Sequence, residues 1–337
     1  MRFATIGTNF ITDRLILNGR KVAGFELAAV YSRTEERARE YAAKQGVRKI
    51  YISLDDLAND PDIDAVYIGS PTYCHAGQAI QMLNAGKHVL CEKPICSNLQ
   101  ELTQMYEAAE RNHVVLLEAM RPWYCPGFRY VEELLPKIGP IHHATFFMCQ
   151  YSSRYNKFKA GIVENAFIRE LSNGGLMDVG CYAVAALAKL FGEPKEVKSL
   201  LRIIPGSIDS HGAMLAGYDD MIGEVVYSKV SGDHIANVIQ GEYATVSISP
   251  IGSFDHVEVF WRDLDKVWFS GQISGQKEIL DFPTVDYAMN YEVEEFLAIC
   301  AGEKSVEEYK AGSFAAMKMM DEIRRQGGYS FPADDWD

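Results

Sequence analysis

Short apolar runs rich in β-branched residues alternate with amphipathic segments over the first 120 residues of the chain. The runs predict strands at Phe3–Ile6, Leu27–Tyr31, Lys49–Ile52, Ala65–Ile68, His88–Cys91 and Val114–Glu118. Helical spacing lies between them, at Glu35–Gln45, Ala76–Ala85 and Leu99–Arg111. This alternation is typical of βαβ units, so residues 1–120 are predicted to form an α/β domain with a Rossmann-like parallel sheet.

After Pro126 the pattern changes to longer, aromatic-rich stretches in which apolar and polar positions alternate. These predict strands at His143–Tyr151, Lys195–Ile204, Gly223–Val230, Asn237–Gln240, Ala244–Ser249, His256–Trp261 and Lys266–Phe269. The turn-forming sequences at 251–253 and 262–265 favour antiparallel hairpins. Residues 121–337 are therefore predicted to form an α+β domain with a large open, mainly antiparallel sheet.

Two features of this second domain bear on its packing. Apolar stripes at helical spacing in Asn290–Gly302 and Gly312–Gln326 are typical of helices that dock on a core. One face of the open sheet must be covered, and a second copy of the chain would cover it symmetrically. We therefore expect a homodimer or homotetramer.

Composition narrows the class of partner. The net charge of −13 speaks against nucleic acid and against an anionic membrane surface, both of which attract basic proteins. The chain reaches Gly7 before a secretory apolar region could form, and no later apolar run approaches ~20 residues. The seven cysteines form no CxxC pair, which indicates reduced thiols with no disulfide framework and no metal site. We expect a cytoplasmic protein that acts on a small molecule.

The loop after the first predicted strand stands where a dinucleotide-binding fold carries the GxGxxG sequence. Its residues are Gly7, Thr8, Asn9, Phe10 and Ile11. Gly7 would make the tight turn that brings the loop to a helix N-terminus, where N–H groups bind a pyrophosphate. Asn9 replaces the second glycine, and its Cβ limits close approach of a phosphate. A purely structural turn between strand and helix would have the same sequence.

The second predicted strand ends in Ser32 and Arg33, at the position of the residue that binds the adenosine ribose. A carboxylate there would bind the 2′-hydroxyl of NAD, whereas a serine and an arginine suit a 2′-phosphate. The cofactor predicted is therefore NADP in preference to NAD. Alternatively, Arg33 is a solvated residue before Thr34, which would cap the next helix.

Other candidates follow later strands. Ser70, Pro71 and His75 come after the fourth strand, at the edge of the sheet that lines the ligand crevice of such folds. His75 would either contact the cofactor or cap the next helix. Glu92 and Lys93 end the fifth strand before Pro94, which would place an ammonium group near the nicotinamide.

In the second domain, Gly174 and Gly175 precede Asp178 and Tyr182, which are four residues apart and would share one side of a helix. Together with the Glu92-Lys93-Pro94 element and the closing 328–332 segment, this sequence resembles the glucose-fructose oxidoreductase, inositol dehydrogenase and MocA (Gfo/Idh/MocA) superfamily over essentially the whole chain. The resemblance implies hydride transfer between a nicotinamide and the carbinol or carbonyl carbon of a small sugar, polyol or diol.

The resemblance also implies residue roles. Lys93 would be catalytic and contact both substrate and cofactor, Asp178 would help to hold the substrate, and Tyr182 would exchange the hydroxyl proton. Tyr182 stands where many members have histidine. A tyrosine at this position is similar to dihydrodiol dehydrogenase and speaks against inositol as the substrate. Arg121 and Trp123 lie in a segment that faces the nicotinamide in relatives, although Arg121 could equally pair with a structural acid.

Two other interpretations remain open from the sequence. The chain could be a nicotinamide-binding sensor or regulatory protein without turnover, but the retention of Lys93, Asp178 and Tyr182 together speaks against it. It could also be a two-domain reductase of the biliverdin reductase type. Such an enzyme would not need the helix that carries Asp178 and Tyr182.

Overall fold

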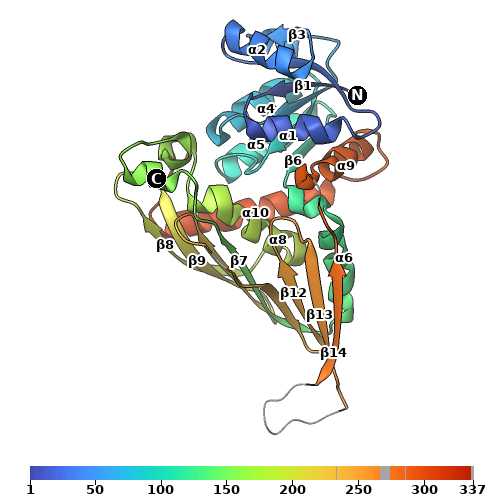
Figure 1. Cartoon of the computed structure of the whole chain (residues 1–337), viewed down its shortest axis with the longest axis vertical. Coiled ribbons are helices and arrows are strands. Elements are labelled where there is room, and N and C mark those ends of the chain that lie inside the picture. The colour runs from blue at the N-terminus through green and yellow to red at the C-terminus, as the bar shows by residue number, and fades with distance from the viewer. Residues whose placement is uncertain (233, 266–273, 285, 335–337) are drawn as a thin grey trace.

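The computed structural model describes residues 1–232, 234–265, 274–284 and 286–334. A parallel sheet lies in the N-terminal half and a larger sheet in the C-terminal half (Figure 1). The predicted fold class is confirmed. The boundary between residues 120 and 121 stays a prediction, because α9 (Asn290–Cys300) returns to the first sheet, where the rings of Phe296 and Phe3 lie 5.7 Å apart.

The N-terminal sheet contains all six predicted strands, with ends that differ by at most two residues. They are β1 (Arg2–Ile6), β2 (Glu26–Tyr31), β3 (Lys49–Tyr51), β4 (Ala65–Ile68), β5 (His88–Glu92) and β6 (Leu116–Ala119). Their order is β3-β2-β1-β4-β5-β6, so the chain changes direction across the sheet between β1 and β4. In open parallel sheets the ligand crevice lies at the carboxyl ends of the strands beside this point.

Helices on both faces bury this sheet, which explains why β4 is apolar and buried throughout. They are α1 (Phe10–Gly19), α2 (Glu35–Gln45), α3 (Leu54–Ala58), α4 (His75–Asn84) and α5 (Leu99–Arg111). Helix α2 ends at Gly46, whose left-handed φ of +70° is the geometry of a helix stop. A one-turn 3₁₀ segment, η2 (Arg121–Tyr124), follows β6 and leads to the second domain.

The C-terminal sheet has eight strands in the order β14-β13-β12-β11-β7-β10-β9-β8. Their bounds are β7 (Ile141–Cys149), β8 (Glu196–Ile203), β9 (Asp209–Gly217), β10 (Ile222–Ser228), β11 (Asn237–Gly241), β12 (Ala244–Ser249), β13 (His256–Arg262) and β14 (Gly275–Asp281). Among the described strand pairs of this sheet, β7 with β10 is the parallel one. The sequence did not indicate β9 or β14, since the alanines and glycines of β9 have low strand propensity. The predicted strand Lys266–Phe269 lies outside the described residues.

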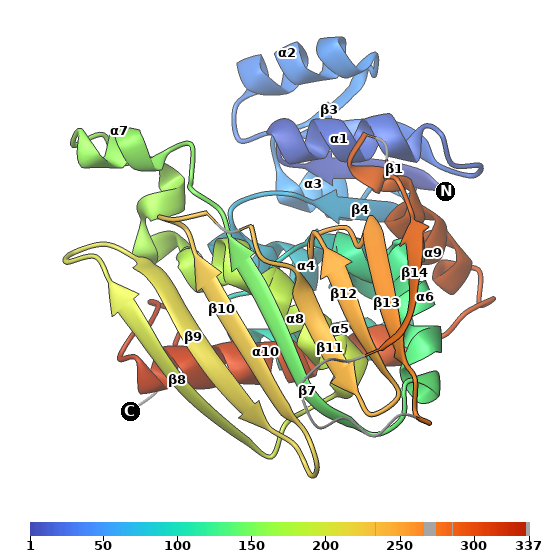
Figure 2. The same ribbon diagram turned by 60° about the horizontal axis from the view of Figure 1, so that its bottom comes forward.

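Helices cover one face of this sheet, and the opposite face carries no described helix (Figure 2). The remaining helices are α6 (Pro126–Leu134), α7 (Tyr155–Lys159), α8 (Cys181–Phe191) and α10 (Glu307–Gln326). Helix α10 begins five residues before its predicted start at Gly312. The acidic Glu307 and Glu308 occupy its first turn, where carboxylates stabilise a helix N-terminus.

Within the described part of the chain, one stretch is long and apolar enough to cross a membrane, Arg169–Phe191, which differs from the expectation that no apolar run approaches this length. Of its most apolar window, 72% is buried inside the protein. The α8 part packs between the sheet and α10, so its apolar character is that of a core helix.

Candidate active site

The loops after β1 and β4 lie against each other at the edge of the first sheet. Gly7 has φ +113°, and a Cβ there would lie 2.6 Å from the carbonyl oxygen of Gly69, so both its backbone and its surroundings require glycine. Asn9 caps α1: its Oδ1 accepts the N–H groups of Ile11 (3.0 Å) and Thr12 (3.2 Å). Its Nδ2 donates to the Gly69 carbonyl at 2.6 Å. Asn9 thus joins the two loops, with an extended backbone at φ −100°.

At the end of β2, Arg33 is exposed and the backbone N–H of Ser32 donates to the Tyr51 carbonyl at 3.1 Å. Thr34 does occupy the N-cap position of α2, but its side chain makes no capping hydrogen bond in the described structure. A second arginine, which the sequence analysis missed, lies nearby. Arg37 donates from Nε to Thr8 Oγ1 (3.2 Å) and from Nη2 to the Thr8 carbonyl (3.1 Å). Its only sequence signal was its position one helical turn after Arg33.

His75 is the first residue of α4 and is buried. Its ring nitrogens lie 2.8 Å from the Ser70 carbonyl and 3.1 Å from the Pro94 carbonyl, and burial lowers its pKa. His75 therefore joins the β4 loop to the β5 loop and neither caps the helix nor lies open to a ligand. Pro71 is exposed beside it, and Ser70 Oγ donates to Gln78 at 2.6 Å.

The end of β5 is held by a buried carboxylate. Glu92 accepts hydrogen bonds from the Tyr67 hydroxyl (2.7 Å) and from the Lys93 backbone N–H (3.2 Å), and burial raises its pKa. With its backbone fixed, Lys93 reaches the second domain. Its Nζ donates to the Asp178 carbonyl at 2.8 Å and lies 4.4 Å from the centre of the Tyr182 ring.

Asp178 lies in a π-helical turn, Leu176–Gly180, which runs directly into α8 and Tyr182. The glycines around it are required by packing. A Cβ on Gly174 would lie 1.9 Å from Asp209 Oδ1, and one on Gly180 would lie 2.9 Å from the Tyr227 ring. Asp209 in turn accepts the N–H of Leu176 at 2.8 Å, so β9 and β10 set the position of this helix.

A buried lysine that the sequence analysis missed completes the cluster. Lys229 follows β10, and its Nζ lies 2.6 Å from Asp178 Oδ2 and donates to the Ala166 carbonyl at 2.9 Å. Burial alone would raise the pKa of Asp178, but the charges of Lys229 and Lys93 lower it to about 2. The carboxylate is therefore ionised at neutral pH. The one sequence signal was a charge inside the apolar run 225–230.

Tyr182 and Lys93, the two groups of the cluster that hold a proton at neutral pH, differ in charge. Burial raises the pKa of Tyr182, and Lys93 opposes this increase only in part, so Tyr182 is a neutral phenol at neutral pH. Burial would lower the pKa of Lys93, but the facing Tyr182, Cys181 and Asp178 raise it overall. At neutral pH, Lys93 is therefore a cation beside a neutral proton donor.

The segment after β6 does not behave as predicted. Trp123 is buried and donates from Nε1 to the Ala185 carbonyl at 3.1 Å, so it belongs to the core around α8 and not to the cluster of Lys93. Among the described residues, Arg121 forms no ion pair with an acid. It donates to the backbone carbonyls of Gly252 (2.6 Å) and Tyr287 (3.2 Å), because η2 packs against those C-terminal loops.

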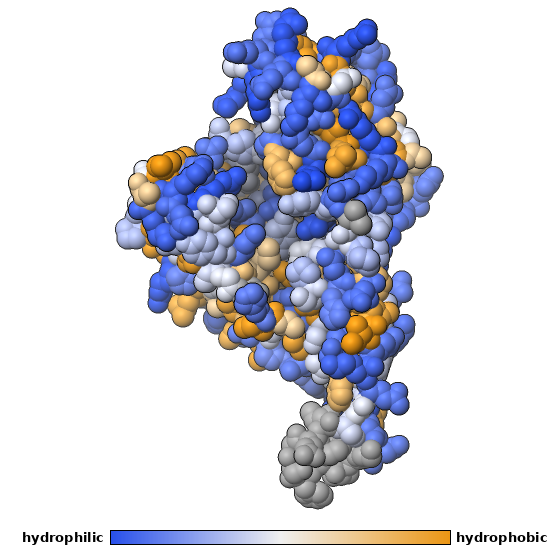
Figure 3. Space-filling view, in the orientation of Figure 1, coloured by the Kyte–Doolittle hydropathy of each residue, from blue (hydrophilic) through white to orange (hydrophobic). Residues whose placement is uncertain are grey.

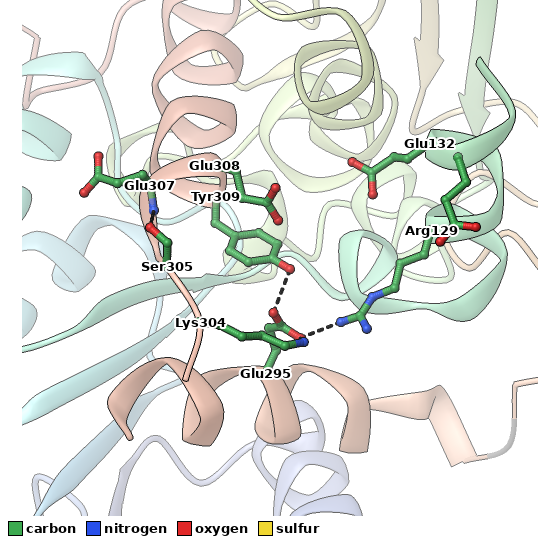
Figure 4. Close-up of a pocket in the computed structure, with 9 residues that line it drawn as sticks. Arg129, Glu132, Glu295, Lys304, Ser305, Glu307, Glu308 and Tyr309 are labelled. Carbon is green, nitrogen blue, oxygen red and sulfur yellow. Dashed lines mark hydrogen bonds and ion pairs between the residues drawn. The ribbon is translucent and has the colours of Figure 1, made fainter. Parts of the chain in front are cut away.

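The surface is hollowed between the domain of the parallel N-terminal sheet and the lobe that carries α7 (Figure 3). A separate cavity of about 570 Å³ lies between α6, α9 and α10 (Figure 4). There Glu295 accepts bonds from Arg129 (2.5 Å), Lys304 (2.7 Å) and the Tyr309 hydroxyl (3.0 Å). Because these groups satisfy one another, we assign this cavity a structural role.

Comparison with known proteins identifies the class. Residues 1–120 match the model of an oxidoreductase family with an NAD-binding Rossmann fold. The scyllo-inositol 2-dehydrogenase (NADP(+)) IolU of Bacillus subtilis (strain 168) is 41% identical over 336 residues, covering 99% of both chains. The mouse trans-1,2-dihydrobenzene-1,2-diol dehydrogenase is 26% identical over 342 residues, 98% of this chain and 96% of that one.

A solved structure has the same fold. KijD10, a 3-ketoreductase from Actinomadura kijaniata in complex with NADP and TDP-benzene, superposes with a TM-score of 0.82 at 20% identity, over 97% of this chain and 98% of that one.

The fold and the relatives together define an NAD(P)-dependent oxidoreductase, as predicted, so the sensor without turnover is not supported. The chain belongs to the Gfo/Idh/MocA family. The expectation that Tyr182 speaks against inositol dehydrogenases does not fit the similarity to IolU.

Proposed function

We propose that this protein is an NADP-dependent dehydrogenase of small cyclic polyols or diols, with Lys93, Asp178 and Tyr182 at its reaction centre. The observation that carries the proposal is their convergence from two domains. Lys93 Nζ contacts the Asp178 backbone at 2.8 Å and the Tyr182 ring at 4.4 Å. The substrate class is supported by the similarity to the scyllo-inositol and dihydrodiol dehydrogenases.

The nucleotide side fits a dinucleotide with a 2′-phosphate. Gly7 leaves no side chain over the turn between β1 and α1. Arg37 contacts Thr8 in that turn, and Arg33 is exposed just after β2, where positions 32 and 33 carry no carboxylate. Arginine binds phosphate through its forked donors. We propose that these residues hold the cofactor, together with the backbone of 7–11 and of Ser70 and Pro71. The dependence on NADP of the relative IolU supports the choice of NADP.

When bound, the nicotinamide supplies the hydride acceptor or donor. Asp178, ionised beside two lysines, would accept a hydrogen bond from a substrate hydroxyl. Tyr182, a neutral phenol, would donate its proton to the oxygen formed during carbonyl reduction and receive one during alcohol oxidation. Lys93 would stabilise the phenolate and the substrate oxygen by its charge.

A substrate panel tests this proposal. Inositol isomers, trans-diols, aldoses and anhydrosugars would be offered with NADP⁺ and with NAD⁺, and their ketones with the reduced cofactors. We expect turnover of at least one cyclic polyol or diol, faster with NADP⁺ and followed by the absorbance of the reduced nicotinamide. Turnover restricted to open-chain substrates, or faster with NAD⁺, would contradict the proposal.

We further propose that the chain forms a homodimer or homotetramer through the uncovered face of the C-terminal sheet. Leu200 on β8 is 72% exposed, and Leu215 and Ile222 on the next two strands are also exposed apolar side chains of this face. Light scattering should report at least twice the chain mass of 37.7 kDa, and Leu200→Glu should lower it. A monomeric parent protein would contradict this proposal.

A cytoplasmic location, with neither nucleic acid nor membrane as a partner, is also proposed. The net charge of −13 and the buried thiols of Cys91, Cys96 and Cys125 support it. Cell fractionation with an antibody against the chain would test the location.

A further inference from the structure

Asp178 lies between two lysines that contact different atoms of it. Lys93 Nζ is 3.8 Å from Oδ1 and directs its hydrogen bond to the backbone carbonyl instead. Lys229 Nζ is 2.6 Å from Oδ2, in direct contact. The Lys229 side chain is 1% exposed, whereas that of Asp178 is 37% exposed. Lys229 is therefore behind the carboxylate and cannot itself contact a substrate.

Lys229 is held from several sides. Its backbone N–H donates to the Ser210 carbonyl at 2.8 Å, and its own carbonyl accepts the Ser152 N–H at 3.0 Å. Its Nζ donates to the Ala166 carbonyl at 2.9 Å and lies 5.2 Å from the centre of the Phe167 ring. The fixed backbone and the three partners of the ammonium group hold Lys229 Nζ in one position. A buried charge of this kind is costly without an opposite charge, which here is the Asp178 carboxylate.

We propose that Lys229 is a positioning residue that occupies Asp178 Oδ2, so that the carboxylate presents Oδ1 alone to the substrate. The assignment rests on the proposed function, in which Asp178 accepts a substrate hydroxyl. Through the Ala166 carbonyl, Lys229 also ties this carboxylate to the segment 151–172, whose η5 part (Arg169–Leu171) contacts the Thr72–Cys74 turn on the nucleotide side.

The other charged or titratable groups around Asp178 do not duplicate this role. Lys93 faces it from the β5 loop at the longer distance, and Arg154 acts on it from the start of the α7 segment, where it pairs with Glu164 at 3.6 Å. On its own helix, Cys181 and Tyr182 face Lys93. Lys229 supplies the largest of the contributions that lower the pKa of Asp178.

The experiment uses the full-length protein in four forms: parent, Lys229→Met, Lys229→Gln and Lys189→Met. Lys189 is the matched control, because it is also a buried lysine, paired with Glu132 at 2.9 Å, but lies at the far end of α8. Carbon-13 NMR of labelled aspartate carboxyls reports the titration of Asp178, with Asp178→Asn as the assignment standard. KM and kcat for the best panel substrate and the Kd of NADPH complete the set.

In the parent, Asp178 should stay ionised down to the lowest pH at which the protein is folded. Removing Lys229 should raise the pKa of Asp178 by roughly 1–3 units, since that is the usual effect of an opposite charge in contact. KM should rise about tenfold or more, as expected for a misplaced hydrogen bond to a charged group, while the Kd of NADPH changes little. Lys189→Met should leave the Asp178 titration as in the parent.

An unchanged Asp178 titration in both Lys229 variants would overturn the proposal, and so would equal rises of KM in the Lys229 and Lys189 variants. Lys229→Gln keeps a donor for Ala166 and provides the measurement if Lys229→Met does not fold. A parent without turnover on the panel would remove the proposed function, and the carboxyl titration would still decide whether Lys229 controls Asp178.

Discussion

The two sides of the cleft hold their polar groups by different means. The nucleotide side consists of the loops that follow β1, β2, β4 and β5, and the substrate side consists of Asp178, Tyr182 and Lys229. On the nucleotide side, the candidates lie in the loops after parallel strands, and short hydrogen bonds between neighbouring loops hold Asn9 and His75. Asn9 reaches the Gly69 carbonyl at 2.6 Å, and His75 bridges the carbonyls of Ser70 and Pro94. The side chain of Arg33 is left exposed. This side presents backbone groups and exposed cations, which suits it to holding a cofactor.

On the substrate side, the groups lie on a buried helix and behind it. Asp178 and Tyr182 belong to one continuous helical segment, which glycines allow to pack closely on Asp209 and Tyr227. Lys229 reaches the same carboxylate from a distant strand. The difference indicates that the loops after β1 and β2 determine cofactor binding, whereas Asp178 and Tyr182, with Lys93 reaching them from the end of β5, determine the chemical step. The predictions at Tyr182, Lys93 and Arg33 test that division.

The largest effect is expected at Tyr182. Tyr182→Phe removes the hydroxyl that would exchange the proton while keeping the ring beside Lys93. Because a positioned proton donor contributes about 10²–10⁴-fold in rate, turnover should fall by that factor. The Kd of NADPH should change little. Stopped-flow rates and cofactor fluorescence titrations on the same preparations measure both.

Lys93→Met serves as the companion variant. If Lys93 and Tyr182 act as one unit, it should lower turnover by a similar factor, and the double variant should be little worse than either single one. Normal turnover in Tyr182→Phe, or a loss confined to cofactor affinity, would break the division between the two sides.

A smaller effect is expected at the seam between the two sides. Glu118 on β6 is buried and accepts bonds from the Ser313 hydroxyl of α10 (2.6 Å) and the Ile95 N–H (3.2 Å). Burial raises its pKa to about 7, whereas an unfolded glutamate titrates near ~4.3. The folded state thus binds the proton more tightly. This stabilisation is complete below about pH 4 and is lost as the pH rises through about 7.

Glu118→Gln should remove that dependence. As the pH rises from 5 to 8, the parent should lose free energy of unfolding on the order of 2–3 kcal/mol that the variant keeps. Urea unfolding at several pH values measures it, with Glu107→Gln on α5 as an exposed control. Parallel pH profiles of the parent and Glu118→Gln would show that Glu118 is already ionised in the folded protein.

The sequence predicted the nucleotide side better than the substrate side, for a physical reason. A strand, its loop and the next helix are adjacent in the chain, so Gly7, Ser32 and Lys93 could be placed from periodicity alone. Lys229 is brought to Asp178 by strand pairing of β10 with β7 and β9, and no local pattern encodes such a contact. Trp123 was predicted beside the nicotinamide but is buried in the core, because the sequence pattern of an aromatic residue after a strand is the same in both cases.

The β9 strand shows a related limit. Its outward positions carry residues such as Ala213, and its inward position Gly212 has no side chain, because a Cβ there would lie 2.6 Å from the Tyr227 hydroxyl. The packing that supports the helix of Asp178 and Tyr182 thus removes the large β-branched residues by which a strand is recognised.

The smallest effect concerns the nucleotide side alone. Arg33→Ala should weaken NADP by about 1.5–3 kcal/mol, roughly 10- to 150-fold, because it removes one charge-assisted contact to the 2′-phosphate. NAD has no phosphate there and should bind as before, and kcat at saturating cofactor should not change. Arg39→Ala is the control, since Arg39 is also an exposed arginine near the end of β2, on the helix α2 that follows Arg33, but pairs with Glu35 at 2.9 Å. Equal weakening of NADP and NAD, or tighter binding of NAD by the parent, would contradict the assignment. A fall in kcat would contradict the division itself, because the loop after β2 would then contribute to the chemical step.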